Sequence, residues 1–477
     1  MIGRLLSDFA DNVIPENVFS DLRFSSILPE STISVLAGLP GADEINRRQE
    51  LFRLLENPEY YARFLDARNS LDLLRDEYKR YKLREGILTR ALSRVLVAEK
   101  YLTCLERLAE LHGCELTDRI SSNAADILPE RRSAISDFVS DTREKLSRSS
   151  EFVLTFASET TLTRAEEPGY LTELREYETK LGLEPLADTG PRLGSEKTLE
   201  DAVTRLFPDF AGKVTDNDPR ISFLEAEVDE LAGLIREFDF FLNLAELSKK
   251  AREKGIPVCF PEISSEHEFT AKKLFDVTLI DSGRIVPNDA ELSDRYIFSF
   301  VVGANGGGKT TFLRAVGVNL MLFLGGAPIF AEKAEIYPFR KLFTHFPADE
   351  LSISTGRFVD ECRRADAITD AADAESFVLI NEAFAGTNDS LGSERALEMA
   401  GKLTQKGASG LFVTHFAGVA YTKDFGLLRA MVDGESNERT FRVVKSRPGE
   451  GSYALDILKK YRLDADSLEK RGETREI

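Results

Sequence analysis

One short stretch limits the possible folds of this chain more than any other. Residues 303–310 read Gly-Ala-Asn-Gly-Gly-Gly-Lys-Thr, which fits the spacing G-x-x-x-x-G-K-[ST]. An apolar run at residues 297–302 precedes this stretch, and an apolar helical pattern from Thr311 follows it. A buried strand, a glycine-rich loop and a helix in this order predict a P-loop, and hence an α/β fold with a mainly parallel sheet.

The residue types of this loop suit a nucleoside triphosphate. Glycines let successive backbone N–H groups approach phosphate oxygens, and the N-terminus of the following helix adds a positive field. We expect Lys309 to contact the β and γ phosphates and the Thr310 hydroxyl to bind Mg²⁺. The nucleotide-binding residues predicted in the loop are Gly303, Asn305, Gly306, Gly307, Gly308, Lys309, Thr310 and Thr311.

Two later strands end in polar residues that can complete such a site. Residues 377–380 form an apolar segment followed by Asn381 and Glu382, and residues 410–414 form another followed by His415. Ligands bind at the carboxyl ends of strands in open parallel sheets. We therefore predict Glu382 as the general base and His415 as the residue that senses the γ-phosphate or holds the attacking water. Asn381 is expected to bind the metal through a water, without the negative charge of the usual Asp.

The N-terminal half is expected to be mainly helical, because its apolar residues recur every three or four positions. Such stripes cover residues 41–55, 64–81, 88–105, 132–157 and 221–245. We expect an irregular lead-in at 1–35, a helical core domain at 36–265 with an insertion at about 158–220, and the α/β domain at 266–477. Further strands are predicted at 334–337, 342–345 and 441–445.

Composition excludes several functional classes. The net charge of −19 argues against a broad surface that coats nucleic acid, so any such contact should be local. The four cysteines form no C-x-x-C pair, which argues against a zinc site or a disulfide framework. No apolar run approaches the length of a membrane span, and Met1 is not followed by a signal segment. We expect a cytoplasmic protein without a membrane partner.

The last two hundred residues resemble the ATPase domain of the MutS family of DNA mismatch-repair proteins. The similar stretches are Ile285 to Asp289, Val302 to Arg314, Asp349-Glu350 with Ser354 to Glu361, Asn381 to Thr387, Val413 to Phe416, and Gly451 to Leu455. The resemblance implies an ABC-like ATPase domain with ATP and Mg²⁺ as cofactors, preceded by long lever helices. It implies that Ile285 and Asn288 hold the nucleotide base. It also implies a homodimer in which Ser354, Thr355, Gly356 and Arg357 of one subunit reach the nucleotide of the other.

The resemblance implies DNA as a partner. Several differences between this sequence and the family pattern limit what kind of DNA binding we expect. The chain has no room before the helical core for mismatch-reading domains, so we expect binding to repair or recombination structures rather than ordinary mismatch recognition. Asn381 in place of Asp, and Ile285 where an aromatic often stacks on adenine, suggest a slow ATPase. The alternative is a slow or structural ATP-binding module with a protein or ribosomal partner. Chromosome-organising ATPases are a third possibility, disfavoured because no long coiled coil is present.

Overall fold

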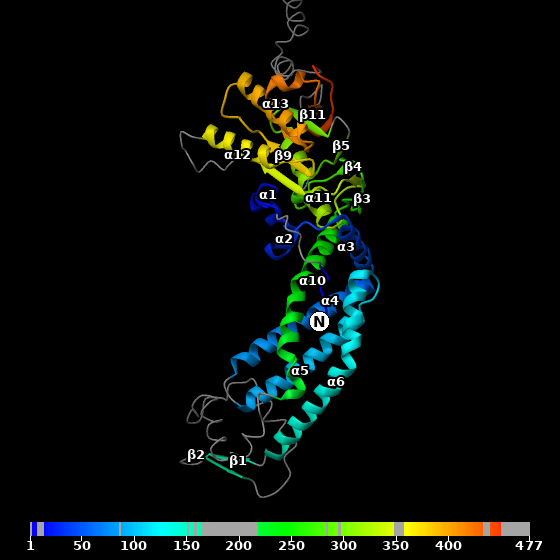
Figure 1. Cartoon of the computed structure of the whole chain (residues 1–477), viewed down its shortest axis with the longest axis vertical. Coiled ribbons are helices and arrows are strands. Elements are labelled where there is room, and N and C mark those ends of the chain that lie inside the picture. Colours follow the sequence, from blue (N-terminus) through cyan, green and yellow to red (C-terminus); the bar gives the residue numbers. More distant parts are fainter. Residues whose placement is uncertain are drawn as a thin grey trace, which may run out of the picture. The chain divides into compact units, whose positions relative to one another are not determined.

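The computed structural model describes residues 2–6, 14–84, 87–149, 152–156, 160–164, 218–282, 285–293, 297–347, 357–432 and 439–449 (Figure 1). The chain forms two compact units. Unit 1 comprises residues 1–5 and 58–238, and unit 2 comprises residues 6–57 and 239–477. Helix α10, Leu224–Glu253, contributes to both. The domain boundaries expected from the sequence, after residues 35 and 265, stay a prediction.

Unit 1 is built from long helices. These are α4 (Pro58–Leu83), α5 (Ile87–Ala109), α6 (Glu115–Ser149) and the first part of α10. Helix α5 packs against both α4 and α6. In the stripe predicted on α4, Phe64, Leu71, Leu74 and Tyr81 are buried. Phe64 stacks on Phe238 of α10, with ring centroids 4.3 Å apart. The apolar spacing therefore correctly predicts helices in these two regions.

The prediction of one helix over residues 132–157 is wrong at both ends. Helix α6 begins much earlier, at Glu115, and continues through Pro129. Residues Phe152–Phe156 form strand β1, which pairs antiparallel with β2, Thr160–Arg164. The segment Phe-Val-Leu-Thr-Phe consists mostly of aromatic and β-branched residues, which favour a strand. The rest of the predicted insertion, residues 165–217, lies outside the described residues.

Unit 2 begins with short helices rather than the irregular lead-in expected. In the range of the expected lead-in these are α1 (Glu16–Asp21) and α2 (Glu30–Leu36), with a 3₁₀ turn η1 at Phe24–Ser26. Helix α3 (Ala42–Leu55) follows, where the apolar stripe at 41–55 predicts a helix. Helices α1 and α2 have six and seven residues, which is at most about two turns. Such short helices show no recognisable 3.6-residue period in the sequence. Phe52 of α3 packs on Phe241 of α10, with ring centroids 4.9 Å apart.

The main sheet of unit 2 has six strands in the order β12-β11-β6-β10-β9-β8. All neighbours are parallel except β11 and β12, which are antiparallel. The strands are β6 (Phe298–Gly303), β8 (Lys341–His345), β9 (Ser376–Asn381), β10 (Ser409–Val413), β11 (Gly426–Val432) and β12 (Arg439–Lys445). The α/β fold with a mainly parallel sheet is confirmed, although β11 was not predicted.

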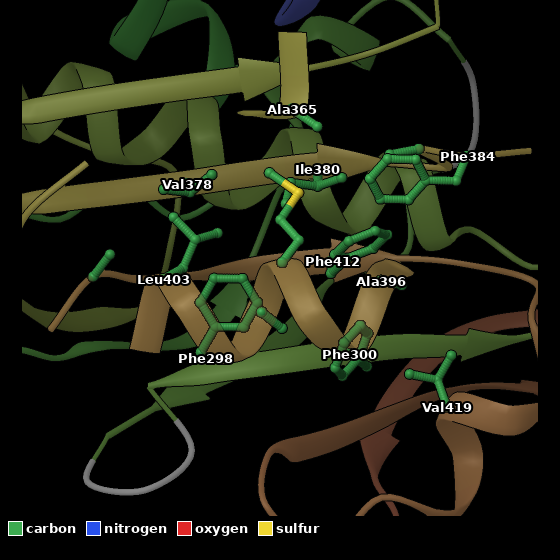
Figure 2. Close-up of a cluster of buried hydrophobic side chains, with 14 of the residues drawn as sticks. Phe298, Phe300, Ala365, Val378, Ile380, Phe384, Ala396, Leu403, Phe412 and Val419 are labelled. Atoms are coloured by element: carbon green, nitrogen blue, oxygen red, sulfur yellow. The ribbon is translucent and has the colours of Figure 1, made fainter. Parts of the chain in front are cut away.

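Helices cover both faces of this sheet. They are α11 (Lys309–Leu324), α12 (Arg357–Ala371) and α13 (Asp389–Gln405). Figure 2 shows Phe298 and Phe300 of β6, Val378 and Ile380 of β9, and Leu403 of α13 in one buried cluster. The intervening β9 residue, Leu379, lies on the other face, where it contacts Gly317 of α11. Both faces are buried, which explains why these strands are continuously apolar.

A second sheet of four strands has the order β3-β7-β4-β5. The strands are β3 (Glu262–Ile263), β4 (Phe269–Leu274), β5 (Asn288–Leu292) and β7 (Lys333–Ile336). Strand β5 lies beside β12 of the main sheet. Further 3₁₀ turns are η2 (Pro219–Ile221), η3 (Val277–Leu279) and η5 (Ala417–Tyr421). Across the described part of the chain, we find no helix with both the length and the apolar character that a bilayer span requires.

Candidate nucleotide-binding site

The predicted P-loop joins β6 to α11, as the sequence pattern requires. Three of its glycines have left-handed backbone angles, with φ of 122° at Gly303, 69° at Gly306 and 97° at Gly308. Residues with a Cβ rarely adopt such angles. A Cβ at Gly303 would also lie 2.8 Å from the carbonyl oxygen of Ala430 in β11. The loop conformation therefore depends on glycine at these positions.

Lys309 is the first residue of α11, and only 4% of its surface is exposed. Its Nζ donates hydrogen bonds to the carbonyl oxygens of Gly303, at 2.9 Å, and Ala304, at 3.4 Å, and to Oδ1 of Asn305, at 3.2 Å. Burial lowers the pKa of Lys309, and the nearby negative charge of Glu382 opposes that shift. The ammonium group is thus held against the loop. This position is consistent with the predicted contact of Lys309 with phosphates bound in the loop.

Thr310 and Asn381 meet although they are far apart in sequence. The Thr310 hydroxyl donates a hydrogen bond of 2.9 Å to Oδ1 of Asn381, the last residue of β9. Both atoms are hard, neutral oxygens, the donor type that suits Mg²⁺. The pair fits the predicted metal position, with Thr310 as a direct ligand and Asn381 acting through a water. Two neutral oxygens attract a dication less than a hydroxyl and a carboxylate would.

Glu382 follows β9 directly and has an unusual backbone conformation. Its φ is 51°, in the left-handed region, and its N–H donates a hydrogen bond of 2.9 Å to the carbonyl oxygen of Val413 in β10. Phe384, two residues later, also has a positive φ, of 66°. Such strain in non-glycine residues costs on the order of 1–3 kcal/mol and is concentrated at functional sites.

His415 lies just beyond the end of β10, and its side chain is exposed. Its ring contacts that of Phe416, with centroids 4.7 Å apart. Val413 of β10 pairs with Val301 of β6 on one side and with Asn381 of β9 on the other. The carboxyl ends of the three parallel strands therefore meet at one edge of the sheet. The structure brings the P-loop, Asn381, Glu382 and His415 together there.

Ile285 and Asn288, the two residues expected to hold the nucleotide base, lie before β5 and at its first residue. Ile285 is half-buried before β5. Asn288 opens β5 and binds the backbone of β12: its Nδ2 donates to the Phe441 carbonyl oxygen at 3.1 Å, and its Oδ1 accepts from the Val443 N–H at 2.7 Å. Asn288 thus joins the two sheets beside the P-loop. Its role toward a base stays a prediction.

The segment expected to reach the partner subunit is mostly outside the described residues. Ser354, Thr355 and Gly356 are not described, and Arg357 is the first residue of α12, with its side chain not described. The C-terminal stretch from Gly451 also lies outside. Thr311, in the first turn of α11, is half-buried.

Sequence reasoning missed the contribution of the β11–β12 hairpin. Ala430 of β11 and Arg439 and Phe441 of β12 lie against P-loop glycines. No spacing rule connects residues more than a hundred positions from the loop. The available signal was the strand predicted at 441–445. The P-loop motif does not predict which other element lies beside the loop.

Comparison with known proteins finds similarity to MutS proteins. Residues 299–461 match the model of MutS domain V. The chain is 31% identical over 226 residues to an Endonuclease MutS2 of Thermomicrobium roseum, covering 45% of this chain and 28% of that protein. It is 27% identical over 432 residues to an Endonuclease MutS2 of Thermotoga neapolitana, covering 83% of this chain and 52% of the relative.

A DNA mismatch repair protein MutS of Thermus thermophilus is 26% identical over 278 residues, covering 53% of this chain and 34% of that protein. The chain therefore spans about half or less of the length of these three curated relatives. The match to domain V begins within β6 and includes the P-loop, Asn381, Glu382 and His415. Residues 299–461 are thus similar to MutS domain V, and the chain is similar to proteins named MutS2 and MutS.

Proposed function

We propose that this chain binds ATP with Mg²⁺ and hydrolyses it, as the nucleotide-dependent switch of a homodimer that acts on DNA. The observation that supports this most directly is the contact between Thr310 and Asn381 at 2.9 Å, beside the buried Lys309. It joins the P-loop to the strand end that carries Glu382. The loop proposed to bind phosphate, the proposed cation position and the Glu382 carboxylate would then share one edge of the sheet.

The residues would divide the chemistry as follows. Backbone N–H groups of the loop and the Lys309 ammonium would bind the phosphate chain. Mg²⁺, when bound by Thr310 and through water by Asn381, supplies positive charge that neutralises the phosphates. Glu382 would accept a proton from a water whose oxygen attacks the γ-phosphorus, while the bond from that phosphorus to the bridging oxygen breaks and ADP leaves. His415 would hold that water or contact the γ-phosphate.

DNA and a second subunit enter the proposal through the relatives. The matched proteins are named Endonuclease MutS2 and DNA mismatch repair protein MutS. We extend DNA as the substrate class to this chain, and we expect recognition of branched or otherwise distorted structures rather than of a base sequence. The homodimer would place residues 354–357 of one subunit at the nucleotide of the other. Contacts that exist only with a γ-phosphate would then drive the switch.

A second candidate is a slow or structural ATP-binding module that acts on a protein or ribosomal partner. The neutral Asn381 favours it, because the metal position lacks the carboxylate that speeds phosphoryl transfer. The net charge of −19 favours it as well, since an acidic chain is repelled by nucleic acid except at local basic sites.

Nucleotide binding and turnover by three forms of the chain test the proposal. Wild type should bind and hydrolyse ATP, Lys309→Ala should lose ATP binding, and Glu382→Gln should bind ATP but not hydrolyse it. Gln retains the size and hydrogen-bonding capacity of Glu but cannot accept the proton. Unchanged ATP affinity of Lys309→Ala would overturn the nucleotide site, and undiminished turnover by Glu382→Gln would overturn the assignment of the base.

The two candidate functions can be separated by equilibrium DNA binding. The measurement uses homoduplex, mismatched and branched DNA, with and without ATP and Mg²⁺, at two salt concentrations. A preference for branched DNA that changes with ATP, and that weakens steeply with salt, is expected for a DNA switch. Absence of binding to all three DNAs, together with slow turnover, would favour the protein or ribosomal partner.

A further inference from the structure

The exposed His415 lies between two buried residues. None of the surface of Thr414 is exposed, and only 1% of that of Phe416 is. The Thr414 N–H donates to the Val301 carbonyl oxygen of β6 at 3.1 Å, and its Oγ1 accepts from the Phe416 N–H at 3.1 Å. His415 is therefore carried by a tight turn, and what holds this turn also sets the position of the imidazole.

The first turn of α13 holds the far side of this turn. Asp389, the first residue of α13, accepts a hydrogen bond of 3.0 Å from the Ala417 N–H through its Oδ1. A Cβ built on Gly392 would lie 2.2 Å from the ring of Phe416, so the ring lies directly against the helix backbone. The same ring is the one that contacts His415, with centroids 4.7 Å apart. Asp389 thus fixes the backbone two residues after His415.

The start of α13 is also tied to the segment that carries Glu382. Asn388 caps the helix, because its Oδ1 accepts a hydrogen bond of 2.9 Å from the Leu391 N–H. Phe384, two residues after Glu382, belongs to the same buried cluster as Phe416 (Figure 2). The first turn of α13 therefore lies between the candidate base and the candidate γ-phosphate sensor, and it contacts the segment of the sensor directly.

The carboxylate of Asp389 can act in two ways. An acidic group in the first turn of a helix is stabilised by the helix dipole, an effect that needs only the charge. Asp389 is exposed, so water and salt weaken that effect. The bond to the Ala417 N–H instead needs an acceptor oxygen at one position. The two roles respond differently to Asn, which keeps the acceptor, and to Glu, which keeps the charge.

We propose that Asp389 is a positioning residue for ATP hydrolysis, which holds the turn that carries His415 against the N-terminus of α13. The role rests on the proposed function, since it requires that His415 contacts the γ-phosphate or the attacking water. Asp389 itself does not touch the nucleotide. Without its hydrogen bond the turn after β10 is free to shift, and a displaced His415 acts less well on the reacting groups.

Steady-state ATP hydrolysis by the full chain with Mg²⁺ tests this role. Asp389→Ala should lower kcat about tenfold and change KM for ATP less than about twofold, because the P-loop is untouched. Asp389→Asn keeps an acceptor oxygen at the same place and should restore kcat to within about twofold of wild type. Asp389→Glu keeps the charge but moves the acceptor by one methylene group, so its kcat should stay low.

A matched control and a double variant complete the experiment. Glu394→Ala removes an equal charge from an exposed position of the same helix and should leave kcat unchanged. His415→Gln should lower kcat, and adding Asp389→Ala to it should have little further effect, because residues that act as a unit are not additive. Circular dichroism confirms that each variant is folded.

The outcomes separate this role from the proposed function. Normal turnover by Asp389→Ala or Asp389→Glu, low turnover by Asp389→Asn, or additive losses in the double variant would each overturn the positioning role, while the nucleotide site stands. If His415→Gln hydrolyses ATP like wild type, the role of His415 fails and that of Asp389 fails with it. If wild type does not hydrolyse ATP, the proposed function itself fails.

Discussion

His345 should make unit 2 less stable at mildly acidic pH. It is the last residue of β8, and 2% of its surface is exposed. Within the described part of the chain, neither ring nitrogen has a hydrogen-bond partner of good geometry. Burial and, to a lesser extent, the positive charge of Arg364 lower the pKa of His345 from 6.5 to about 4, against the opposing effect of backbone hydrogen bonding at Glu361 and at His345 itself. The imidazole is therefore held neutral in the folded protein.

The direction and size of the effect follow from this pKa. The unfolded chain binds the proton more readily, so the contribution of His345 is fully present above pH 6.5 and is lost as the pH falls toward 4. Between about pH 7.5 and about pH 5 the folded state should lose about 2 kcal/mol from this residue. Complete protonation would cost about 3 kcal/mol.

Urea denaturation followed by circular dichroism at several pH values measures this contribution as a difference between variants. His345→Leu removes the titrating ring and keeps an apolar volume, so its stability should decline less with acid than that of wild type, by about 2 kcal/mol at about pH 5. His415→Gln removes an exposed histidine of the same unit and should follow wild type. Parallel pH dependence of wild type and His345→Leu would refute the reasoning.

Two further predictions concern the main sheet and the metal position. Asn381→Asp should lower the Mg²⁺ concentration needed for half-maximal ATP turnover about tenfold, because a carboxylate would replace the amide beside Thr310; an unchanged Mg²⁺ dependence would contradict the placement of the metal. Gly410→Ala should destabilise the protein by about 3 kcal/mol or more in urea denaturation, because its Cβ would collide with the Val378 carbonyl oxygen on the neighbouring strand. Gly401→Ala is the control: apart from its own helix backbone and chain neighbours, that helical glycine has no atom within 4 Å of a built Cβ, so alanine should stabilise by about 0.5–1 kcal/mol. Equal stabilities of the two alanine variants would show that the close approach of β9 and β10 does not restrict residue 410.

Long helices and fully buried strands were predictable because their signals are local. The stripe on α4 and the apolar runs of β6, β9 and β10 each appear within one continuous segment. Strand β1 was mistaken for helix, since five residues beside a long helical pattern are too few to show a period. Strand β11 was not predicted, although it pairs with β6. Its place in the sheet depends on this long-range pairing, which its own residues do not reveal.

The sequence by itself determined the chemistry of the candidate site, because its signals are local. They are glycines, a lysine and a threonine at fixed spacing, and polar residues directly after apolar strands. Tertiary structure decided which of these groups meet. Thr310 contacts Asn381 across 71 positions, and Arg439 and Phe441 contact the P-loop only because β12 joins the sheet beside β11 with a bulge. Strand order and register arise from long-range packing and hydrogen bonding, which no local pattern of residues encodes.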